Sequence, residues 1–234
     1  MFERFRDRED AGRRLAVNLS GYASAPNVLI LALPRGGVPV GFEVARSLKA
    51  PLDIFTVRKL GVPGHEELAM GAIASGGTIV LNDEIVAALR IPEEVIRRVA
   101  ASESAELQRR DRLYRGDAAA PAIAGRTVIL VDDGLATGAS MKAAVSAVRQ
   151  LRPRAVVVAV PVGARDTCTM LRELADDVIC AESPYPFHAV GIWYQDFSQT
   201  TDDEVRHLLQ SSRPAAVAQN APQRQPVREG RGRL

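Results

Sequence analysis

Cysteines are scarce in this chain, and long apolar runs are absent. Its 234 residues include 2 cysteines, Cys168 and Cys180, whose spacing fits no metal-binding or redox motif. We therefore expect both thiols to be reduced and the protein to be cytoplasmic. No stretch approaches the roughly 20 apolar residues of a membrane span. The charged start, MFERFRDRED, is not typical of a secretory signal.

Three common nucleotide-binding and catalytic motifs are also missing. The chain has no GK[ST] of a phosphate-binding P-loop and no G-x-G-x-x-G of a dinucleotide loop. It also has no G-x-S-x-G nucleophile motif. These absences argue against a P-loop nucleotide-binding protein, a dinucleotide-dependent enzyme and an α/β hydrolase.

Charge of one sign does not dominate the chain, except at its end. The formal net charge is +2, from 30 basic and 28 acidic residues. Residues 213–234 hold five arginines, one glutamate and no aromatic residue. Such a segment cannot bury enough apolar surface to fold, so it predicts a disordered basic tail. A nucleic-acid partner is not required by this balance, and a solvated tail is the simpler interpretation.

Residues 1–212 alternate strand-like and helix-like segments, which predicts a single α/β domain. Short apolar runs are typical of strands buried on both faces, and they alternate with helical patterns of about ten residues. We expect a mostly parallel central sheet flanked by helices. The predicted strands are residues 27–33, 52–60, 78–82, 126–133, 154–162 and 177–183; the predicted helices are 38–49, a helical insert over 83–115, 141–151 and 165–175.

Three loops follow predicted strands, namely LPRGG at 33–37, VRKLG at 57–61 and VDDGLATGAS at 131–140. Ligands of such sheets bind at the carboxyl ends of the strands. The third loop has small residues and hydroxyls at a helix N-terminus, where free backbone amides bind phosphate. Its two aspartates suit a ribose diol or a bound divalent cation. A plain helix cap remains the alternative interpretation.

The segment VILVDDGLATGAS resembles the phosphoribosyl-diphosphate (PRPP) signature of the type I phosphoribosyltransferases, in a form similar to the adenine enzymes. LPRGGVPVG is similar to the family's pyrophosphate loop, and FTVRKLGVPG to its basic strand. The resemblance implies ribose binding by the acidic pair, phosphate binding by the loop and pyrophosphate binding by a turn that is often cis. The implied residues are Asp132 and Asp133 for ribose; Gly134, Leu135, Ala136, Thr137, Gly138, Ala139 and Ser140 for the 5′-phosphate; Arg35, Gly36 and Gly37 for pyrophosphate.

The resemblance also implies catalytic groups and a lid. Arg58 and Lys59 would neutralise pyrophosphate, and Glu66 or Glu67 would act on the acceptor. Residues 61–77 contain five glycines and predict a flexible lid loop, with a loose hairpin as the alternative. Exposed loop and strand-end charges would explain the same residues without a catalytic role. The 6-oxopurine members carry an aspartate where this chain has Ala136, so a loop base for those purines is absent.

The aromatic stretch PFHAVGIWYQDF, residues 186–197, loosely resembles the acceptor wall of the 6-oxopurine enzymes. Phe187, Trp193 and Tyr194 are therefore candidate acceptor-binding residues, and a packed aromatic cluster is the alternative. The cofactor implied is Mg²⁺, held mainly through PRPP, with Asp132, Asp133 and Asp196 as its candidate protein ligands.

The sequence thus predicts Mg²⁺-dependent transfer of a phosphoribosyl group from PRPP to a nitrogenous acceptor, with a nucleobase as the expected class. A PRPP-binding regulatory protein without transfer activity is the alternative. The expected partners are PRPP and a small acceptor, with no membrane and with a homodimer possible.

Overall fold

The core of the chain is a five-stranded sheet in which every neighbouring pair of strands is parallel. The computed structural model describes residues 3–116 and 118–213. The strands lie in the order β2-β1-β6-β7-β8. Their bounds are Val28–Ala32 (β1), Leu52–Ile54 (β2), Thr127–Val131 (β6), Ala155–Val162 (β7) and Asp177–Glu182 (β8). The predicted α/β architecture is confirmed.

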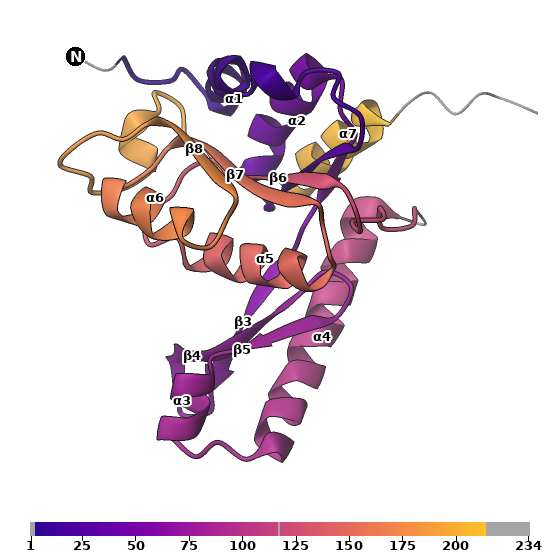
Figure 1. The fold of residues 1–234 in the computed structure, drawn as a ribbon, viewed down its shortest axis with the longest axis vertical. Helices are drawn as coiled ribbons and strands as arrows, with labels where there is room; N and C mark the ends of the chain where they lie inside the picture. The colour runs from indigo at the N-terminus through magenta and orange to yellow at the C-terminus, as the bar shows by residue number, and fades with distance from the viewer. Residues whose placement is uncertain (1–2, 117, 214–234) are drawn as a thin grey trace, which may run out of the picture.

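Helices cover both faces of this sheet, as Figure 1 shows. Alternate residues of β1 explain why, because Ile30 packs with one group of helices and Leu31 with the other. One face carries α1 (Arg8–Asn18), α2 (Gly37–Leu48) and α7 (Asp202–Ser212), and the other carries α5 (Ala139–Gln150) and α6 (Arg165–Arg172). Short 3₁₀ turns occupy Ser20–Tyr22 (η1) and Gly191–Trp193 (η2). Helices α1 and α7 have no counterpart among the sequence predictions.

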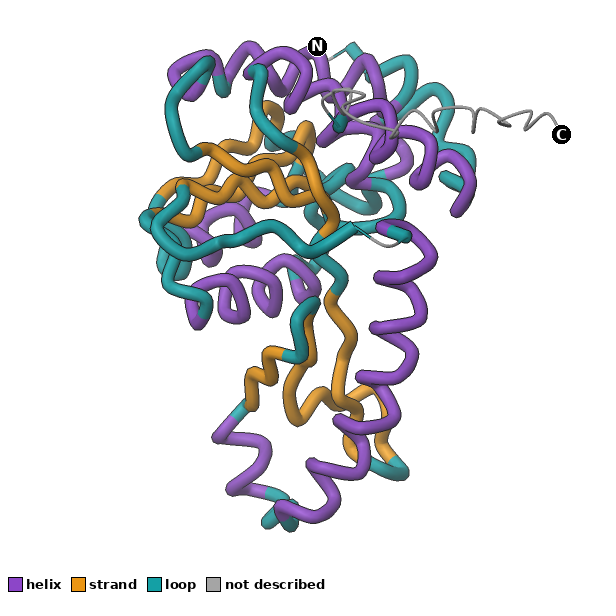
Figure 2. Tube along the Cα trace, turned by 90° about the vertical axis from the view of Figure 1, so that its right-hand side faces the viewer, coloured by secondary structure: helices purple, strands orange, loops and turns teal. Residues whose placement is uncertain are grey.

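Residues 57–115 form a second lobe, here called the hood, which projects from the core in both Figure 1 and Figure 2. An antiparallel sheet of β3 (Val57–Val62), β4 (His65–Ala74) and β5 (Thr78–Leu81) lies against α3 (Asp83–Ala88) and α4 (Glu93–Arg115). Leu60, Met70, Ile73 and Leu107 are buried at its centre. The predicted helical insert is confirmed, and it supplies one wall of an independent small core.

The predicted loop over residues 61–77 is instead most of a β-hairpin, the alternative that the sequence left open. Gly61 and Gly71 permit close strand pairing, whereas Gly64, Gly76 and Gly77 have positive φ and lie in the turns between strands. A Cβ on Gly71 would overlap the carbonyl oxygen of Val80 and lie 3.2 Å from Leu81 Cα. The predicted strand over 52–60 is likewise divided, since β2 ends at Ile54 and β3 begins the separate hood sheet. Sequence periodicity alone does not reveal that change of sheet.

A buried polar network joins the hood to the core. Ser75 Oγ accepts a hydrogen bond from the Thr56 amide at 2.9 Å and donates to Asp111 at 3.2 Å. Arg115 then bridges Asp111 at 2.9 Å and Asp53 at 2.8 Å. Arg115 is 8% exposed. Removing one partner of such a buried ion pair strongly destabilises the folded state, because the other charge is left buried and unpaired. The network therefore fixes the base of α4 against the carboxyl end of β2.

No helix within the described residues is both long and apolar enough to cross a membrane. The predicted disordered tail, residues 213–234, lies outside the described residues except for Arg213, whose side chain donates to the Arg115 carbonyl oxygen at 3.1 Å.

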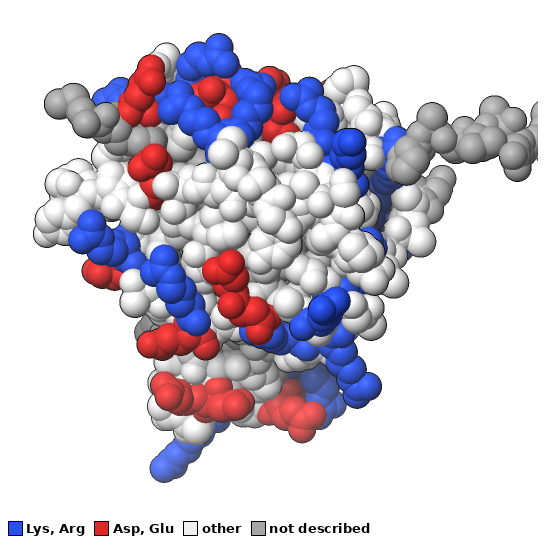
Figure 3. Space-filling view, turned by 45° about the horizontal axis from the view of Figure 1, so that its top comes forward, with Lys and Arg blue, Asp and Glu red and all other residues white. Residues whose placement is uncertain are grey.

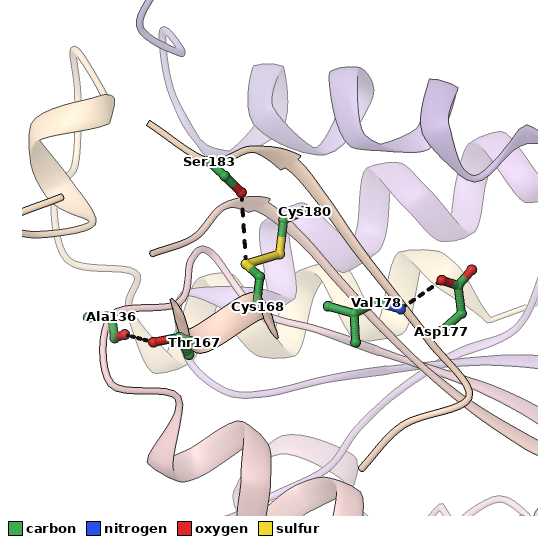
Figure 4. The surroundings of a disulfide bond; sticks show 7 residues. All are labelled: Ala136, Thr167, Cys168, Asp177, Val178, Cys180 and Ser183. Carbon is green, nitrogen blue, oxygen red and sulfur yellow. Dashed lines mark hydrogen bonds between the residues drawn. A yellow bond between two sulfur atoms is a disulfide. The ribbon is translucent and has the colours of Figure 1, made fainter. Parts of the chain in front are cut away.

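The expectation of reduced thiols is wrong in this structure, because Cys168 of α6 and Cys180 of β8 are joined by a disulfide (Figure 4). Spacing in the sequence could not reveal the pair, since the two residues meet only after α6 packs beside the edge strand β8. The bond fastens the helix that lies beside residues 134–140.

We expect reduction of this disulfide to lower the free energy of unfolding by about 2–3 kcal/mol. The bond closes a loop with a sequence separation of 12. Closing a loop of this size restricts the unfolded chain, and the lost entropy raises the free energy of the unfolded state by about 3 kcal/mol. Chemical denaturation with and without a dithiol reductant measures the effect. The Cys168→Ala/Cys180→Ala double variant is the control, and an equal effect of reductant on it would contradict the prediction.

Candidate functional site

The carboxyl ends of β1 and β6 lie side by side and bring two of the three predicted loops together. Ala32 is in register with Val131, and the Leu33 amide donates to the Val131 carbonyl oxygen at 2.8 Å. The turn at 34–37 therefore meets the acidic pair at 132–133, as expected for parallel neighbours.

The turn after β1 is shaped so that its backbone lies directly on the acidic pair. The peptide between Pro34 and Arg35 is cis. A Cβ on Gly36 would overlap Asp133 Oδ2 and lie 2.7 Å from its Cγ. A Cβ on Gly37 would lie 2.9 Å from Asp132 Cα. Both glycines are thus required by close approach.

Asp132 and Asp133 form a partly buried pair at this point. The Asp133 amide donates to Asp132 Oδ1 at 2.9 Å. Burial, together with the neighbouring Asp133 carboxylate, raises the pKa of Asp132 well above its usual range. Burial also raises the pKa of Asp133, and the guanidinium of Arg8 opposes that rise. Holding two neighbouring carboxylates in a partly buried position lowers the stability of the folded state. Titratable groups with such strongly shifted pKa values are typical of binding sites.

Two residues that the sequence reasoning did not single out for this role hold Asp133. Arg8 Nε donates to Asp133 Oδ2 at 2.9 Å. The hydroxyl of Tyr194 donates to the Asp133 carbonyl oxygen at 2.6 Å. Tyr194 is 3% exposed, and burial raises its pKa. Tyr194 therefore supports the acidic pair from the core, and its burial argues against the predicted role as an acceptor-stacking surface.

The loop at 134–140 is anchored at its start and open at its end. Leu135 is buried, its amide donates to the Val162 carbonyl oxygen at 2.9 Å, and its carbonyl accepts from the Ala164 amide at 2.8 Å. Gly138, with φ of 72°, precedes the first turn of α5, and no side chain caps that helix. Thr137, Ala139 and Ser140 lie in this open part of the loop, with Ala139 and Ser140 exposed. Amides and hydroxyls at such a helix N-terminus are available to an anion.

Helix α6 supports this loop from behind, as Figure 4 shows. Thr167 Oγ1 donates to the Ala136 carbonyl oxygen at 2.6 Å, and Thr167 directly precedes Cys168 of the disulfide. The loop conformation is thereby fixed before a ligand binds.

The predicted catalytic residues lie in the hood and are engaged with hood carboxylates. Arg58 pairs with Glu103 of α4, and Lys59 Nζ pairs with Glu67 at 3.1 Å. Glu66 accepts a hydrogen bond from the Gly64 amide at 3.0 Å. Hydrogen bonds from its own and the Gly64 amide lower the pKa of Glu66, which weakens it as a base. The structure does not bring these residues to the acidic pair.

The remaining aromatic and acidic candidates lie on the segment after β8. The rings of Phe187 and Trp193 stack with centroids 6.3 Å apart. Asp196 is exposed, and a hydrogen bond from the Ser198 amide lowers its pKa. Across residues 3–116 and 118–213, no group of three His, Cys, Asp or Glu is arranged to hold a metal. Asp132 and Asp133 carry carboxylate oxygens, the ligand type that Mg²⁺ prefers.

Comparison with known proteins identifies the family to which this chain belongs. A family model described as "Phosphoribosyl transferase domain" matches residues 1–193. The chain belongs to the phosphoribosyl transferase family. The matched residues include the N-terminal helix α1, which carries Arg8.

Two curated relatives of this chain are Mycobacterium tuberculosis proteins, "Putative phosphoribosyl transferase MT0597" (strain CDC 1551 / Oshkosh) and "Putative phosphoribosyl transferase Rv0571c" (strain ATCC 25618 / H37Rv). Each is 48% identical over 206 residues, which cover 88% of this chain and 46% of the relative. The chain thus spans about half the length of those relatives. TT1426 from Thermus thermophilus has a crystal structure that matches with a TM-score of 0.80 at 44% identity, over 89% of this chain and 98% of that one.

Proposed function

We propose that this phosphoribosyl transferase moves the 5-phosphoribosyl group of PRPP to a nitrogenous acceptor and releases pyrophosphate with the aid of Mg²⁺. One observation carries the proposal. The cis turn at 34–37, the acidic pair at 132–133 and the open loop at 134–140 meet at one edge of the parallel sheet. PRPP has a pyrophosphate, a diol and a phosphate in the matching order.

The chemistry requires positioning more than covalent catalysis. Loop amides at the α5 N-terminus would hold the 5′-phosphate, while the acidic pair would accept hydrogen bonds from the ribose hydroxyls. The amides of Arg35 and Gly36 would face the pyrophosphate, since Pro34 has no N–H and the Gly37 amide donates to the Leu33 carbonyl oxygen at 3.0 Å. Carboxylates near the ring also favour the positive charge that develops as the leaving group departs. Asp132 and Asp133 would hold Mg²⁺, which would supply positive charge to offset the negative charge of the leaving group.

A PRPP-binding regulator is the second candidate, and one observation favours it. Arg58 and Lys59 are engaged with Glu103 and Glu67 in the hood. The exposed Lys59–Glu67 pair contributes about 0–1 kcal/mol, so a pyrophosphate could draw Lys59 away, whereas the Arg58–Glu103 pair is partly buried. An enzyme would require Arg58 and Lys59 to leave these carboxylates for the pyrophosphate, whereas a binding protein would not.

We expect pyrophosphate release when PRPP and Mg²⁺ are supplied with a suitable acceptor from a panel of nucleobases and amines. An enzyme-coupled pyrophosphate assay measures it, with Asp133→Asn as the inactive control. Calorimetric PRPP binding without release for any acceptor would favour the regulator. Absence of PRPP binding would contradict both candidates.

A further inference from the structure

We propose that Arg8 is a positioning residue of the ribosyl site, which holds one oxygen of Asp133 so that the other faces the ribose diol. The inference rests on the proposed function, and it adds a residue from outside the three loops. Arg8 Nε and the Gly36 turn both approach Asp133 Oδ2. Oδ1 is then the oxygen that remains for a ribose hydroxyl.

Three contacts fix the guanidinium itself. Besides Asp133, Arg8 Nη1 donates to the Ser198 carbonyl oxygen at 2.6 Å, and its Cζ lies 4.0 Å from the centroid of the Phe197 ring. Its side chain is 12% exposed. A planar guanidinium can satisfy two hydrogen bonds and a ring face together, whereas a lysine ammonium offers no such plane. The site is therefore built for arginine.

Backbone hydrogen bonds between Phe5 and residues 193–195 position the segment that leads into Arg8. The Phe5 amide donates to the Trp193 carbonyl oxygen at 2.9 Å, and the Gln195 amide returns a bond to the Phe5 carbonyl oxygen at 2.8 Å. Asp7 caps α1 by accepting from the Asp10 amide at 2.7 Å. Arg8 is thus the first residue of a capped helix whose entry is fastened to the Tyr194 segment.

Helix electrostatics do not explain this placement. A cation in the first turn of a helix is unfavourable with respect to the helix dipole. The other α1 arginines, Arg13 and Arg14, are more exposed. Arg13 pairs with Glu9 and, at 3.8 Å, with Glu43 of α2, and Arg14 pairs with Asp10. Figure 3 shows such charges of both signs together at the edge where α1 lies. Arg8 differs because its partner belongs to the acidic pair and lies 125 residues away in sequence.

The test compares ribose 5-phosphate, 2-deoxyribose 5-phosphate and inorganic pyrophosphate by calorimetry. We expect the wild type to prefer the ribose ligand by about tenfold, the value of one charge-assisted hydrogen bond. Arg8→Met should reduce that preference to less than about threefold and leave pyrophosphate affinity unchanged. Arg8→Lys should give an intermediate preference, because it restores the charge without the planar fork.

Arg14→Met is the matched control, because Arg14 lies on the same helix and over the Phe5 ring at 5.3 Å without touching the acidic pair. It should keep the full preference. Equal weakening of all three ligands by Arg8→Met would assign Arg8 a purely structural role and overturn the inference. An undiminished preference in Arg8→Met, or in Arg8→Lys if the first variant does not fold, would also overturn it. A wild type with no preference would overturn the proposed ribose site itself, which separates the two failures.

Discussion

Gly36→Ala should weaken PRPP binding by roughly ten- to a hundredfold, since losing one charge-assisted hydrogen bond from a displaced carboxylate costs about 1.5–3 kcal/mol. The methyl group would overlap Asp133 Oδ2 and lie 3.2 Å from Arg8 Nε. Either the acidic pair or the turn must move. Both movements separate the groups that would hold the ribose from those that would hold the pyrophosphate. Calorimetry with PRPP and Mg²⁺ measures the effect.

Gly21→Ala is the control for this substitution. Gly21 lies in η1, and a Cβ there would meet no atom within 4 Å. It should bind PRPP as the wild type does. If Gly36→Ala retained wild-type affinity, the turn would not contact the ligand, and the pyrophosphate role of Arg35, Gly36 and Gly37 would be withdrawn.

The central sheet was predictable because its strands are continuous apolar runs and its helices are amphipathic. The phosphate loop was predictable for a related reason, since small residues at a strand-to-helix junction have few alternatives to exposed amides. Both signals are local in the sequence. Local signals place an element correctly whenever the element's own residues decide its conformation.

The hood was less predictable from the sequence, because its glycines are compatible with both a flexible loop and close strand pairing. Gly71 reads as a flexible position until Val80 lies against it, and then it is the residue that permits strand pairing. Leu60, Met70 and Leu107 form a core only when α4 packs on the hairpin. A hydrophobic pattern cannot say which sheet a strand joins, so β2 and β3 were predicted as one.

The parts of the candidate site that were missed come from distant segments. Arg8 and Tyr194 reach Asp133 from opposite ends of the chain's folded region. Nothing adjacent to either residue in the sequence signals a carboxylate partner. Arg35 was predicted, but its ion-pair partner was not. Its guanidinium lies 3.7 Å from Asp202 of α7, and Asp202 also accepts a hydrogen bond from the Tyr114 hydroxyl at 2.7 Å. Such partners are fixed by topology, and only the folded chain shows them.

Asp132→Asn should stabilise the protein at neutral pH while removing a large part of its PRPP affinity. The stability gain follows from the raised pKa of Asp132, which burial and the Asp133 carboxylate cause. An acid whose pKa is higher in the folded state binds its proton more tightly there, so stability falls as pH rises from the unfolded to the folded pKa. Each unit of such a rise corresponds to about 1.4 kcal/mol.

The asparagine side chain removes this penalty and keeps an oxygen for the Asp133 amide, which now donates to Asp132 Oδ1. The difference in melting temperature should be small below the ordinary aspartate pKa, where both states of the wild type are protonated. It should grow as pH rises and become constant above the folded pKa. Thermal melts of both proteins across this range measure the curve.

Affinity should change in the opposite direction. A ribose hydroxyl loses a charge-assisted hydrogen bond, which corresponds to about 1.5–3 kcal/mol, or roughly ten- to a hundredfold in the dissociation constant. Asp196→Asn is the control, because the Ser198 amide lowers the pKa of Asp196 and its substitution cannot relieve a burial penalty. Its stability should therefore not increase with pH relative to the wild type. If Asp132→Asn neither stabilised the fold nor weakened PRPP, the acidic pair would be an ordinary surface pair. Stabilisation accompanied by lost affinity would instead identify Asp132 as a residue kept at the expense of stability in order to bind the ligand.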